Sequence, residues 1–270
     1  MTLPVESDRF TLEEAFVQKV LTRMGLAPQK IAESDNDGER TCDFRASDGQ
    51  ARFWVEVKAR TGDATIREEI RKQEVVLRSR PLGYSSRMAS VISRAVTQLD
   101  ALARTGEGFE ILWMVMSHRG ECGLHFTQAI ATAFGSEDII DLAGDGITRP
   151  CYFFKESSFF KHKSLDGMAV YAADRRMTLC VNPFSPRAAA FRETSFFRFF
   201  EEMGREQGAL GTVDAAAMEK AGLAYVADCD IPRRDADAVM AHVQKKYGLK
   251  HPIHITLDEH SAMTLLPPEE

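Results

Sequence analysis

The sequence predicts an α/β protein whose core is a mixed β-sheet flanked by helices. Between residues 11 and 117, amphipathic segments with helical spacing alternate with short apolar segments, in the order helix, strands, helix, strand. Two of these strands are separated only by a turn, which indicates antiparallel pairing. The last strand is apolar throughout, which is typical of a central strand covered on both faces.

The first helix is expected at residues 11–24. Thr11, with Glu14 three residues later, forms a capping-box pattern, in which each residue satisfies a free backbone N–H of the other. Apolar residues then recur at helical spacing, and Gly25 ends the helix. Glu14 therefore has a structural explanation as a cap. It also lies at the edge of the apolar stripe, where a carboxylate can enter a cleft beside the sheet.

A short strand is expected at residues 29–32, followed by a hairpin. Its strands are predicted at 42–46 and 52–59, joined by a Ser-Asp-Gly-Gln turn at 47–50. The second strand is apolar enough to lie inside a sheet, although it carries two charged residues.

Three charged side chains are expected to meet at the open end of this hairpin. Side chains alternate faces along a strand, so Glu56 and Lys58 point to the same face. Pairing through the turn brings Asp43 alongside Glu56. Ionisable groups on a buried strand need a reason, and two carboxylates beside an ammonium group suit a hard divalent cation and the water that it activates. The alternative is a solvated charge pair on a strand face.

The segment from residue 60 to residue 84 follows directly and is rich in basic residues. Pairs such as Glu68 and Lys72, at i,i+4 spacing, favour a solvated helix. The alternative is a flap that contacts phosphates. The candidate nucleic-acid-binding residues in this segment are Arg60, Arg67, Arg71, Lys72, Arg78 and Arg80.

Later elements are predicted from periodicity and apolar runs. Helices are expected at 86–104, 126–134, 191–203 and 235–247, and strands at 110–117, 167–172, 177–181 and 253–257. We therefore divide the chain into a domain at 1–120 and a C-terminal α+β region at 121–270. The second region is a recognition domain, a platform for a partner, or an elaboration of the same sheet.

The composition is that of a soluble globular protein, with 270 residues, 44% hydrophobic, 27% charged and a net charge of −6. Neither a signal peptide nor an apolar run long enough to span a bilayer is found, so no membrane partner is expected. Five cysteines occur singly, which favours reduced thiols in the cytoplasm over disulfides or a zinc ribbon. The acidic balance does not exclude nucleic acid, because local charge decides binding.

The order of a helical Glu, a strand Asp and a Glu-x-Lys on the next strand resembles the PD-(D/E)XK nuclease superfamily. Its restriction-endonuclease-like fold has an α-β-β-β-α-β core. The first helix is also similar to those of Mrr-type endonucleases and archaeal Holliday-junction resolvases, because Glu14 precedes apolar residues at +3, +6, +7 and +10 and Gly25 at +11. The resemblance covers residues 10–117. It departs from the family at Cys42, where the proline of the family's name would stand.

This resemblance implies a site for Mg²⁺ or Mn²⁺. Asp43 and Glu56 would bind the ion through their carboxylates, with the main-chain carbonyl of Val57 as a further ligand. Glu14 would hold a coordinated water or a second ion. Lys58 would orient the attacking water and stabilise the charge that grows on the scissile phosphate.

Gln98 is the candidate for a polar residue on the following helix that faces the site in some members of the family. A solvated position on the helix surface is the alternative. Crowded carboxylates repel one another and raise each other's pKa, so we expect the metal to restore stability. Lys58 gains from the negative field and stays protonated, which favours a positioning and electrostatic role.

Other patterns are weaker. His251, His254 and His260 are close in sequence, but the spacing of the first two across Pro252 on a strand turns their side chains apart, which disfavours a transition-metal site. Pairs of phenylalanines in the second half could stack bases, although core packing explains them better.

The sequence therefore predicts a Mg²⁺-dependent endonuclease, a phosphodiester hydrolase with DNA as the favoured substrate. The alternative is an inactive protein of the nuclease fold that binds nucleic acid or assembles with a partner. A third reading is an unrelated α/β enzyme in which Glu56 and Lys58 are surface charges. Cleavage of both strands would favour a homodimer, although the sequence indicates no interface.

Overall fold

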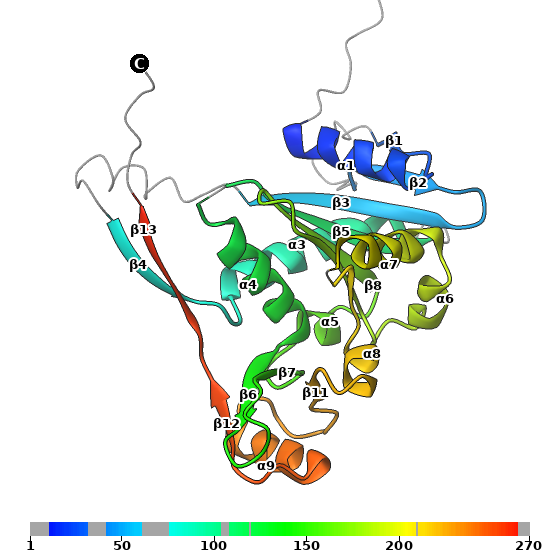
Figure 1. Cartoon of the computed structure of the whole chain (residues 1–270). Helices are drawn as coiled ribbons and strands as arrows, with labels where there is room; N and C mark the ends of the chain where they lie inside the picture. Colours follow the sequence, from blue (N-terminus) through cyan, green and yellow to red (C-terminus); the bar gives the residue numbers. More distant parts are fainter. Residues whose placement is uncertain are drawn as a thin grey trace, which may run out of the picture.

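The computed structural model of the chain describes residues 11–31, 42–60, 76–103, 108–118, 120–208 and 210–263. These residues form a large mixed sheet covered by helices on both faces (Figure 1), which confirms the predicted fold class at this level. None of the helices described is long and apolar enough to cross a lipid bilayer.

The described part of the main sheet has seven strands. In chain order they are β1 (Gln29–Lys30), β2 (Phe44–Ser47), β3 (Arg52–Arg60), β5 (Phe109–Met116), β8 (Leu165–Ala172), β9 (Met177–Val181) and β10 (Thr212–Val213). Their spatial order is β1-β2-β3-β5-β8-β9-β10. The central strands β3, β5 and β8 are parallel, whereas β2 and β9 pair with them antiparallel. The central strands are buried because their sequences are apolar almost throughout.

Helices cover the two faces of this sheet. One face carries α1 (Leu12–Arg23), α6 (Ala188–Arg192) and α7 (Ser195–Gln207), and the other carries α3 (Ser86–Ala103), α4 (Cys122–Phe134) and α5 (Ser158–Lys161). Alternation along β5 supplies both cores. Ile111 and Trp113 pack under the first group of helices, and Leu112 and Met114 pack under the second.

A smaller sheet and a two-stranded ribbon complete the structure. The strands of the smaller sheet are β6 (Glu137–Asp141), β7 (Arg149–Tyr152), β11 (Tyr225–Val226) and β12 (Pro252–Ile255), in the order β11-β7-β6-β12. Helix α8 (Ala215–Lys220) leads into it, and α9 (Ala236–Tyr247) packs on it through Val239 and Val243. The ribbon consists of β4 (Val76–Pro81) and β13 (Asp258–Met263), which are antiparallel. Figure 1 shows the small sheet with α9 at the bottom and the ribbon on the left.

The β2–β3 hairpin depends on its turn. Asp48 Oδ1 accepts hydrogen bonds from the N–H groups of Gln50 (2.9 Å) and Ala51 (2.7 Å). Gly49 has a φ of +87°, a conformation that favours glycine. Ser195 Oγ donates to Asp48 Oδ2 (2.5 Å) and ties the turn to the start of α7. The turn therefore fixes both the register of the hairpin and its place in the core.

Two predictions about helices are wrong. Residues 76–81 form β4 instead of part of a solvated helix, because they pair with β13 near the C-terminus, a partner that no local pattern reveals. The rest of that basic segment, 61–75, lies outside the described residues. The single helix expected at 191–203 is two helices, since Thr194 is extended and caps α7, its Oγ1 accepting from Phe197 N (3.3 Å).

Strand β6 escapes prediction because charged residues occupy its buried positions. Glu137 forms an ion pair with Lys155, and Asp141 accepts hydrogen bonds from the N–H groups of Lys250 (3.0 Å) and His251 (2.7 Å). Because these partners satisfy the carboxylates, charged residues can occupy buried positions of β6. Its sequence therefore lacks the alternation of apolar and polar residues that is typical of a strand.

The second half of the chain contributes to both sheets. Strands β8, β9 and β10 extend the main sheet beyond β5, while β6, β7, β11 and β12 form the small one. The boundary at residue 120 and the division into 1–120 and 121–270 stay predictions.

A buried ionic network lies where β5 and β8 begin. Arg187 forms ion pairs with Asp166 (2.7 Å) and Glu110 (3.5 Å), and Asp166 also accepts from the N–H of Glu110 (2.8 Å). Glu110 is 2% exposed. Burial, together with the negative charges of Asp100 and Asp166, raises its pKa to about 7, although Arg187 opposes the shift.

We expect Glu110→Gln to stabilise the protein at alkaline pH. The pKa of Glu110 in the folded state lies above the ordinary value of 4.5. Ionisation of Glu110 therefore lowers the free energy of unfolding above pH 7 and does not affect it below pH 4. The free energy of unfolding should rise by about 1–3 kcal/mol at pH 8, with little change at pH 4. Urea unfolding at both pH values measures this. Glu202→Gln, on the exposed side of α7, is the control, and an equal effect at both pH values would contradict the prediction.

Candidate functional site

The three charged residues of the hairpin lie together where β3 extends past the start of β2. Phe44 pairs with Val55, so Asp43, one residue earlier, comes beside Glu56. Val55 and Val57 pack into the core under α1, while Glu56 and Lys58 belong to the opposite face of the strand. The carboxylates of Asp43 and Glu56 therefore share one end of the sheet.

Asp43 takes the place of a strand neighbour for β3. Its Oδ2 accepts a hydrogen bond from the backbone N–H of Val57 at 2.6 Å. In a strand, the N–H and C=O of one residue point to the same side. The main-chain carbonyl of Val57 therefore faces the same side as the Asp43 carboxylate.

Glu56 and Lys58 form an ion pair across the top of the strand. The side chain of Glu56 is 1% exposed and that of Lys58 is 28% exposed, so the pair runs from the interior toward solvent. The second carboxylate oxygen of Glu56, Oε2, is buried and has no hydrogen-bond partner among the described residues. A buried carboxylate oxygen without a partner carries a free-energy cost that a cation would remove.

Burial and mutual repulsion disfavour the ionised forms of these carboxyl groups. Burial raises the pKa of Asp43 to about 6, the nearby charge of Glu14 adds to this, and the hydrogen bond from Val57 opposes it. Burial and then the charge of Asp43 raise the pKa of Glu56 to about 7, while Lys58 opposes the shift. Two acids with raised pKa values side by side are typical of a functional site.

Glu14 combines the two roles that the sequence leaves open. Its side chain closes the capping box, accepting from Thr11 N (2.7 Å), while Thr11 Oγ1 accepts from Glu14 N (3.1 Å). Its Oε2 also lies 3.0 Å from Lys30 Nζ. Burial opposes ionisation, but the bonds from Thr11 and Lys30 outweigh it and hold the pKa below its ordinary value. Glu14 thus both closes the capping box and lies close enough to Asp43 to influence its charge.

A polar pocket of about 440 Å³ adjoins Lys58. It is lined by Lys58, Ala59, Arg60, Val91, Arg94 and Gln98. The structure therefore brings the predicted residue Gln98 to the same pocket as Lys58. The sequence analysis did not select Arg94. Its position one helical turn before Gln98 was the available indication, because i and i+4 share a helix face.

The basic residues proposed to bind nucleic acid are placed differently from one another. Arg60 lines the pocket, and Arg80 forms an ion pair with Glu121 (2.6 Å). The backbone of Arg78 lies in β4, opposite Ser261 of β13. The remaining three, Arg67, Arg71 and Lys72, lie outside the described residues.

Cys42 directly precedes Asp43 and lies in the core. Its thiol is buried and donates to the carbonyl of Phe44 (3.3 Å). Burial, followed by the negative charges of Glu56 and Asp43, raises its pKa to about 12. All five cysteines lie within the described residues, and none of them forms a disulfide bond.

The donor set suits a hard divalent cation in its chemistry. Asp43, Glu56 and the carbonyl of Val57 offer oxygen ligands only, and the unpartnered Oε2 of Glu56 lies among them. Within the described ranges, however, no group of three or more His, Cys, Asp or Glu side chains is arranged to hold an ion. Glu56 is turned to Lys58 and Glu14 to Lys30, so ammonium groups supply the positive charge in this arrangement.

Comparison with known proteins gives no assignment from sequence. No family model matches the chain, and no curated protein matches it. Among solved structures, the Holliday junction resolvase Hjc from Archaeoglobus fulgidus, an archaeal hyperthermophile, is similar over 38% of this chain, with 19% sequence identity and a TM-score of 0.23. The match spans 66% of that chain, just under two thirds of its length.

We expect Mn²⁺ to raise the melting temperature of the protein relative to EDTA. An ion bound only by the folded state stabilises it, and here it would also relieve repulsion between Asp43 and Glu56. A rise of at least about 2 °C is expected for the wild type, and Asp43→Asn should remove it. Asp237→Asn, in the first turn of α9, is the control. An undiminished rise in the Asp43 variant would show that the ion binds elsewhere.

Proposed function

We propose that this protein is a metal-dependent nuclease that hydrolyses phosphodiester bonds, with DNA as its substrate. One observation carries the proposal. Asp43 and Glu56, both with raised pKa values, adjoin Lys58 at one end of the sheet, and Lys58 opens into a pocket lined with further cations. The resemblance of this residue order to the PD-(D/E)XK superfamily supports the same reading.

Asp43 and Glu56 would hold a divalent ion through their carboxylates, with the Val57 carbonyl as a third ligand and Glu14 beside them. When bound, Mg²⁺ or Mn²⁺ supplies an acidified water and neutralises charge on the phosphate. The hydrogen bond from Val57 N already positions the Asp43 carboxylate for this role. Glu56 would have to give up its ion pair with Lys58 in order to bind the ion.

Lys58 is suited to stabilise the transition state. Its ammonium group neutralises Glu56 in the free protein, yet the side chain is partly exposed and borders the pocket. Once the positive charge at the carboxylates comes from the ion, Lys58 can turn toward the scissile phosphate and donate hydrogen bonds to its oxygens. This is electrostatic stabilisation of the charge that develops during attack.

The pocket beyond Lys58 is suited to the neighbouring part of the phosphate backbone. Arg60 and Arg94 provide two guanidinium groups, which bind phosphates in a bidentate manner, and Gln98 provides an amide. Arg94 donates only to the carbonyl of Ser90 (3.4 Å), and no carboxylate in the described part of the chain pairs with it. Its charge is available for a ligand.

A cleavage panel tests the proposed function. Wild-type and Glu56→Gln protein would be incubated with plasmid, linear duplex, four-way junction, single-stranded DNA and RNA, in Mg²⁺, Mn²⁺ or EDTA. Metal-dependent cleavage by the wild type only is expected, because Gln keeps the shape of Glu56 without its charge. Binding of nucleic acid without cleavage in any arm would instead support an inactive protein of the nuclease fold.

Lys58 and Arg94 should separate catalysis from binding. Lys58→Met should abolish cleavage while changing DNA affinity less than about threefold, because one phosphate contact among many contributes little. Arg94→Gln should weaken binding about tenfold or less and lower the slope of log affinity against log salt by about one. Gel-shift titrations at several salt concentrations measure both. Arg205→Gln, on α7 across the sheet, is the control, and full cleavage by Lys58→Met would refute the role of Lys58.

A further inference from the structure

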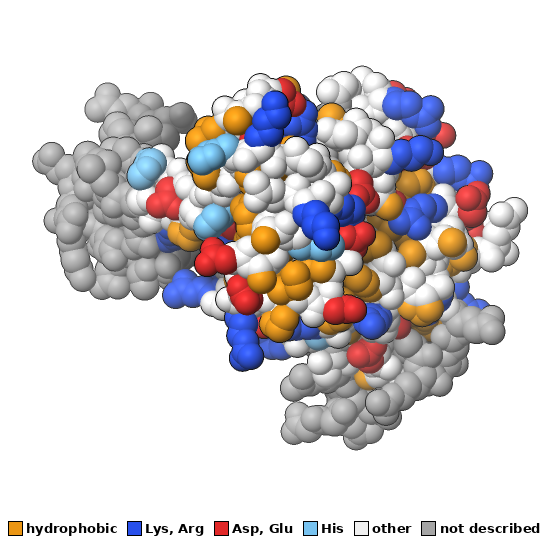
Figure 2. All heavy atoms as spheres, turned by 90° about the horizontal axis from the view of Figure 1, so that it is seen from below, with side chains coloured by type: hydrophobic (Ala, Val, Ile, Leu, Met, Phe, Trp, Pro, Cys, Tyr) orange, Lys and Arg blue, Asp and Glu red, His pale blue; other side chains and the backbone are white. Residues whose placement is uncertain are grey.

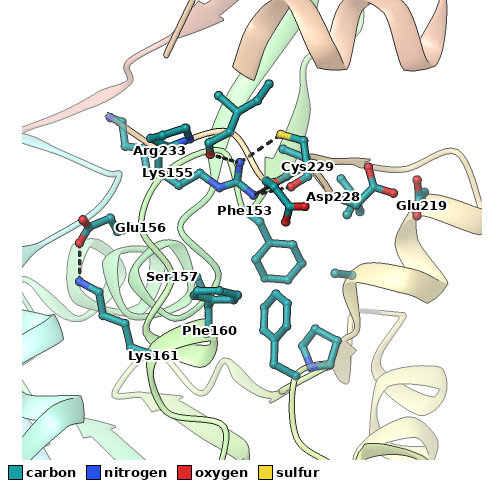
Figure 3. A pocket seen from close by; sticks show the side chains of 18 of the residues that line it. Phe153, Lys155, Glu156, Ser157, Phe160, Lys161, Glu219, Asp228, Cys229 and Arg233 are labelled. Atoms are coloured by element: carbon teal, nitrogen blue, oxygen red, sulfur yellow. Dashed lines mark hydrogen bonds and ion pairs between the residues drawn. The ribbon is translucent and has the colours of Figure 1, made fainter. Parts of the chain in front are cut away.

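A second and larger pocket is lined by residues between Phe153 and Arg234 (Figure 3). Its volume of about 800 Å³ falls within the range of roughly 300–1,000 Å³ found for small-molecule sites. Its walls come from α5, α8 and the loops that follow β7, β9 and β11. Strand β9 runs antiparallel to β8, so β9 ends beside the start of β8. Lys58 lies near the C-terminal end of β3, which is parallel to β5 and β8, and therefore at the other end of these strands. The pocket is therefore separate from the candidate site described above.

Three phenylalanines form one wall of this pocket. The ring of Phe184 lies edge-on to Phe153 (centroids 4.8 Å apart) and to Phe160 (5.2 Å). Phe160 is 57% exposed, in contrast to the buried phenylalanines of the core. Phe153 has a φ of +61°, a conformation that costs a bulky residue on the order of 1–3 kcal/mol and is concentrated at functional sites.

The aromatic wall is held rigidly. The side-chain amide of Asn182 donates to the carbonyls of His162 (3.0 Å) and Leu165 (2.7 Å), and its Oδ1 accepts from the N–H of Phe184 (3.0 Å). Asn182 is fully buried. Phe184 is thus fixed before any ligand arrives, which lowers the entropy cost of binding.

Two arginines form the opposite wall. The guanidinium of Arg233 donates to the carbonyls of Ala227 (2.9 Å), Cys229 (2.8 Å) and Ile231 (3.0 Å), and it contacts the sulfur of Cys229 (3.1 Å). None of these acceptors is a carboxylate, so Arg233 has no ion pair within the described residues, although the N–H groups of its two terminal nitrogens are occupied. Arg234 is adjacent, exposed, and also without an ion pair in the same part of the chain. Figure 3 shows Arg233 and the rings of Phe153 and Phe160 around the same cavity.

Most carboxylates in the pocket are already engaged. Glu219 and Asp228 form ion pairs with Lys246 (2.7 and 2.9 Å), and Glu156 pairs with Lys161. Asp230 remains as an acceptor for a polar group of a ligand. On the surface of this end of the molecule, basic and acidic side chains alternate around apolar ones (Figure 2). Among the described residues, Arg233 and Arg234 are thus the pocket cations without an ion pair, and Asp230 is a lining carboxylate without one.

We propose that this pocket binds a nucleotide, with the base against Phe160 and Phe184 and the phosphate at Arg234, beside the positive charge of Arg233. Every base has a flat π-surface that stacks on aromatic side chains, and guanidinium groups match phosphate oxygens. A free nucleotide and a base of a single strand share this chemistry. The volume of the pocket is that of a small-molecule site, which favours the free nucleotide.

Calorimetric titration of the full chain with AMP, GMP, CMP, UMP, ATP, inorganic phosphate and a short single-stranded oligonucleotide tests this. We expect at least one nucleotide to bind and inorganic phosphate to bind far more weakly. Phe160→Ala and Arg234→Gln should each raise the Kd about tenfold, since a stacked base contributes roughly 1–3 kcal/mol. Both residues are exposed, so neither change threatens folding. Arg205→Gln is the control, and Glu56→Gln should leave the Kd unchanged.

The outcomes are distinct. Nucleotide binding that both variants weaken supports the proposal, also if no nuclease activity is found. Oligonucleotide binding alone, weakened by the same two variants, would keep the chemistry but assign the pocket to a base of a strand. No binding by any of these compounds, or binding that neither variant weakens, would overturn the proposal.

Discussion

The hydrogen bond from the backbone of Val57 to the carboxylate of Asp43 determines the geometry of the candidate site. Strand β2 starts too late to pair with the last part of β3, and the side chain of Asp43 supplies the missing acceptor at 2.6 Å. This contact places one carboxylate beside Glu56 and directs the Val57 carbonyl to the same side. The turn at Asp48 and Gly49 fixes the register on which the contact depends.

In the free protein, burial and repulsion between the carboxylates are unfavourable at this site, and ion pairs with lysines offset part of this free-energy cost. Glu56 is buried next to Asp43 and pairs with Lys58, while Glu14 pairs with Lys30. Such an arrangement is stable only while each ammonium group stays in place. A divalent ion held by Asp43 and Glu56 would supply this positive charge instead, and the ammonium group of Lys58 would then be available for substrate.

Local sequence patterns predicted the elements that local forces determine. The capping box of Thr11 and Glu14, the hairpin around Asp48 and the apolar strand at β5 follow from neighbours within a few residues. They were sufficient to place Asp43 next to Glu56. Elements that depend on long-range pairing could not be predicted from local patterns. Strand β4 forms because it pairs with β13, and β6 can bury Glu137 and Asp141 because residues distant in the sequence satisfy their carboxylates. The pockets lined by Arg94 and by Arg233 likewise arise only when separate elements meet.

The ribbon of β4 and β13 has a consequence for the order of folding. Val76 pairs with Met263, and Pro81 pairs with Asp258. During synthesis β13 is made after every described strand of the main sheet, so β4 is made long before its partner. Contacts of such large sequence separation form late, since the loop between them must first be ordered. The ribbon is therefore completed only after the described strands of the main sheet have been made, so β4 is without its partner strand while that sheet assembles.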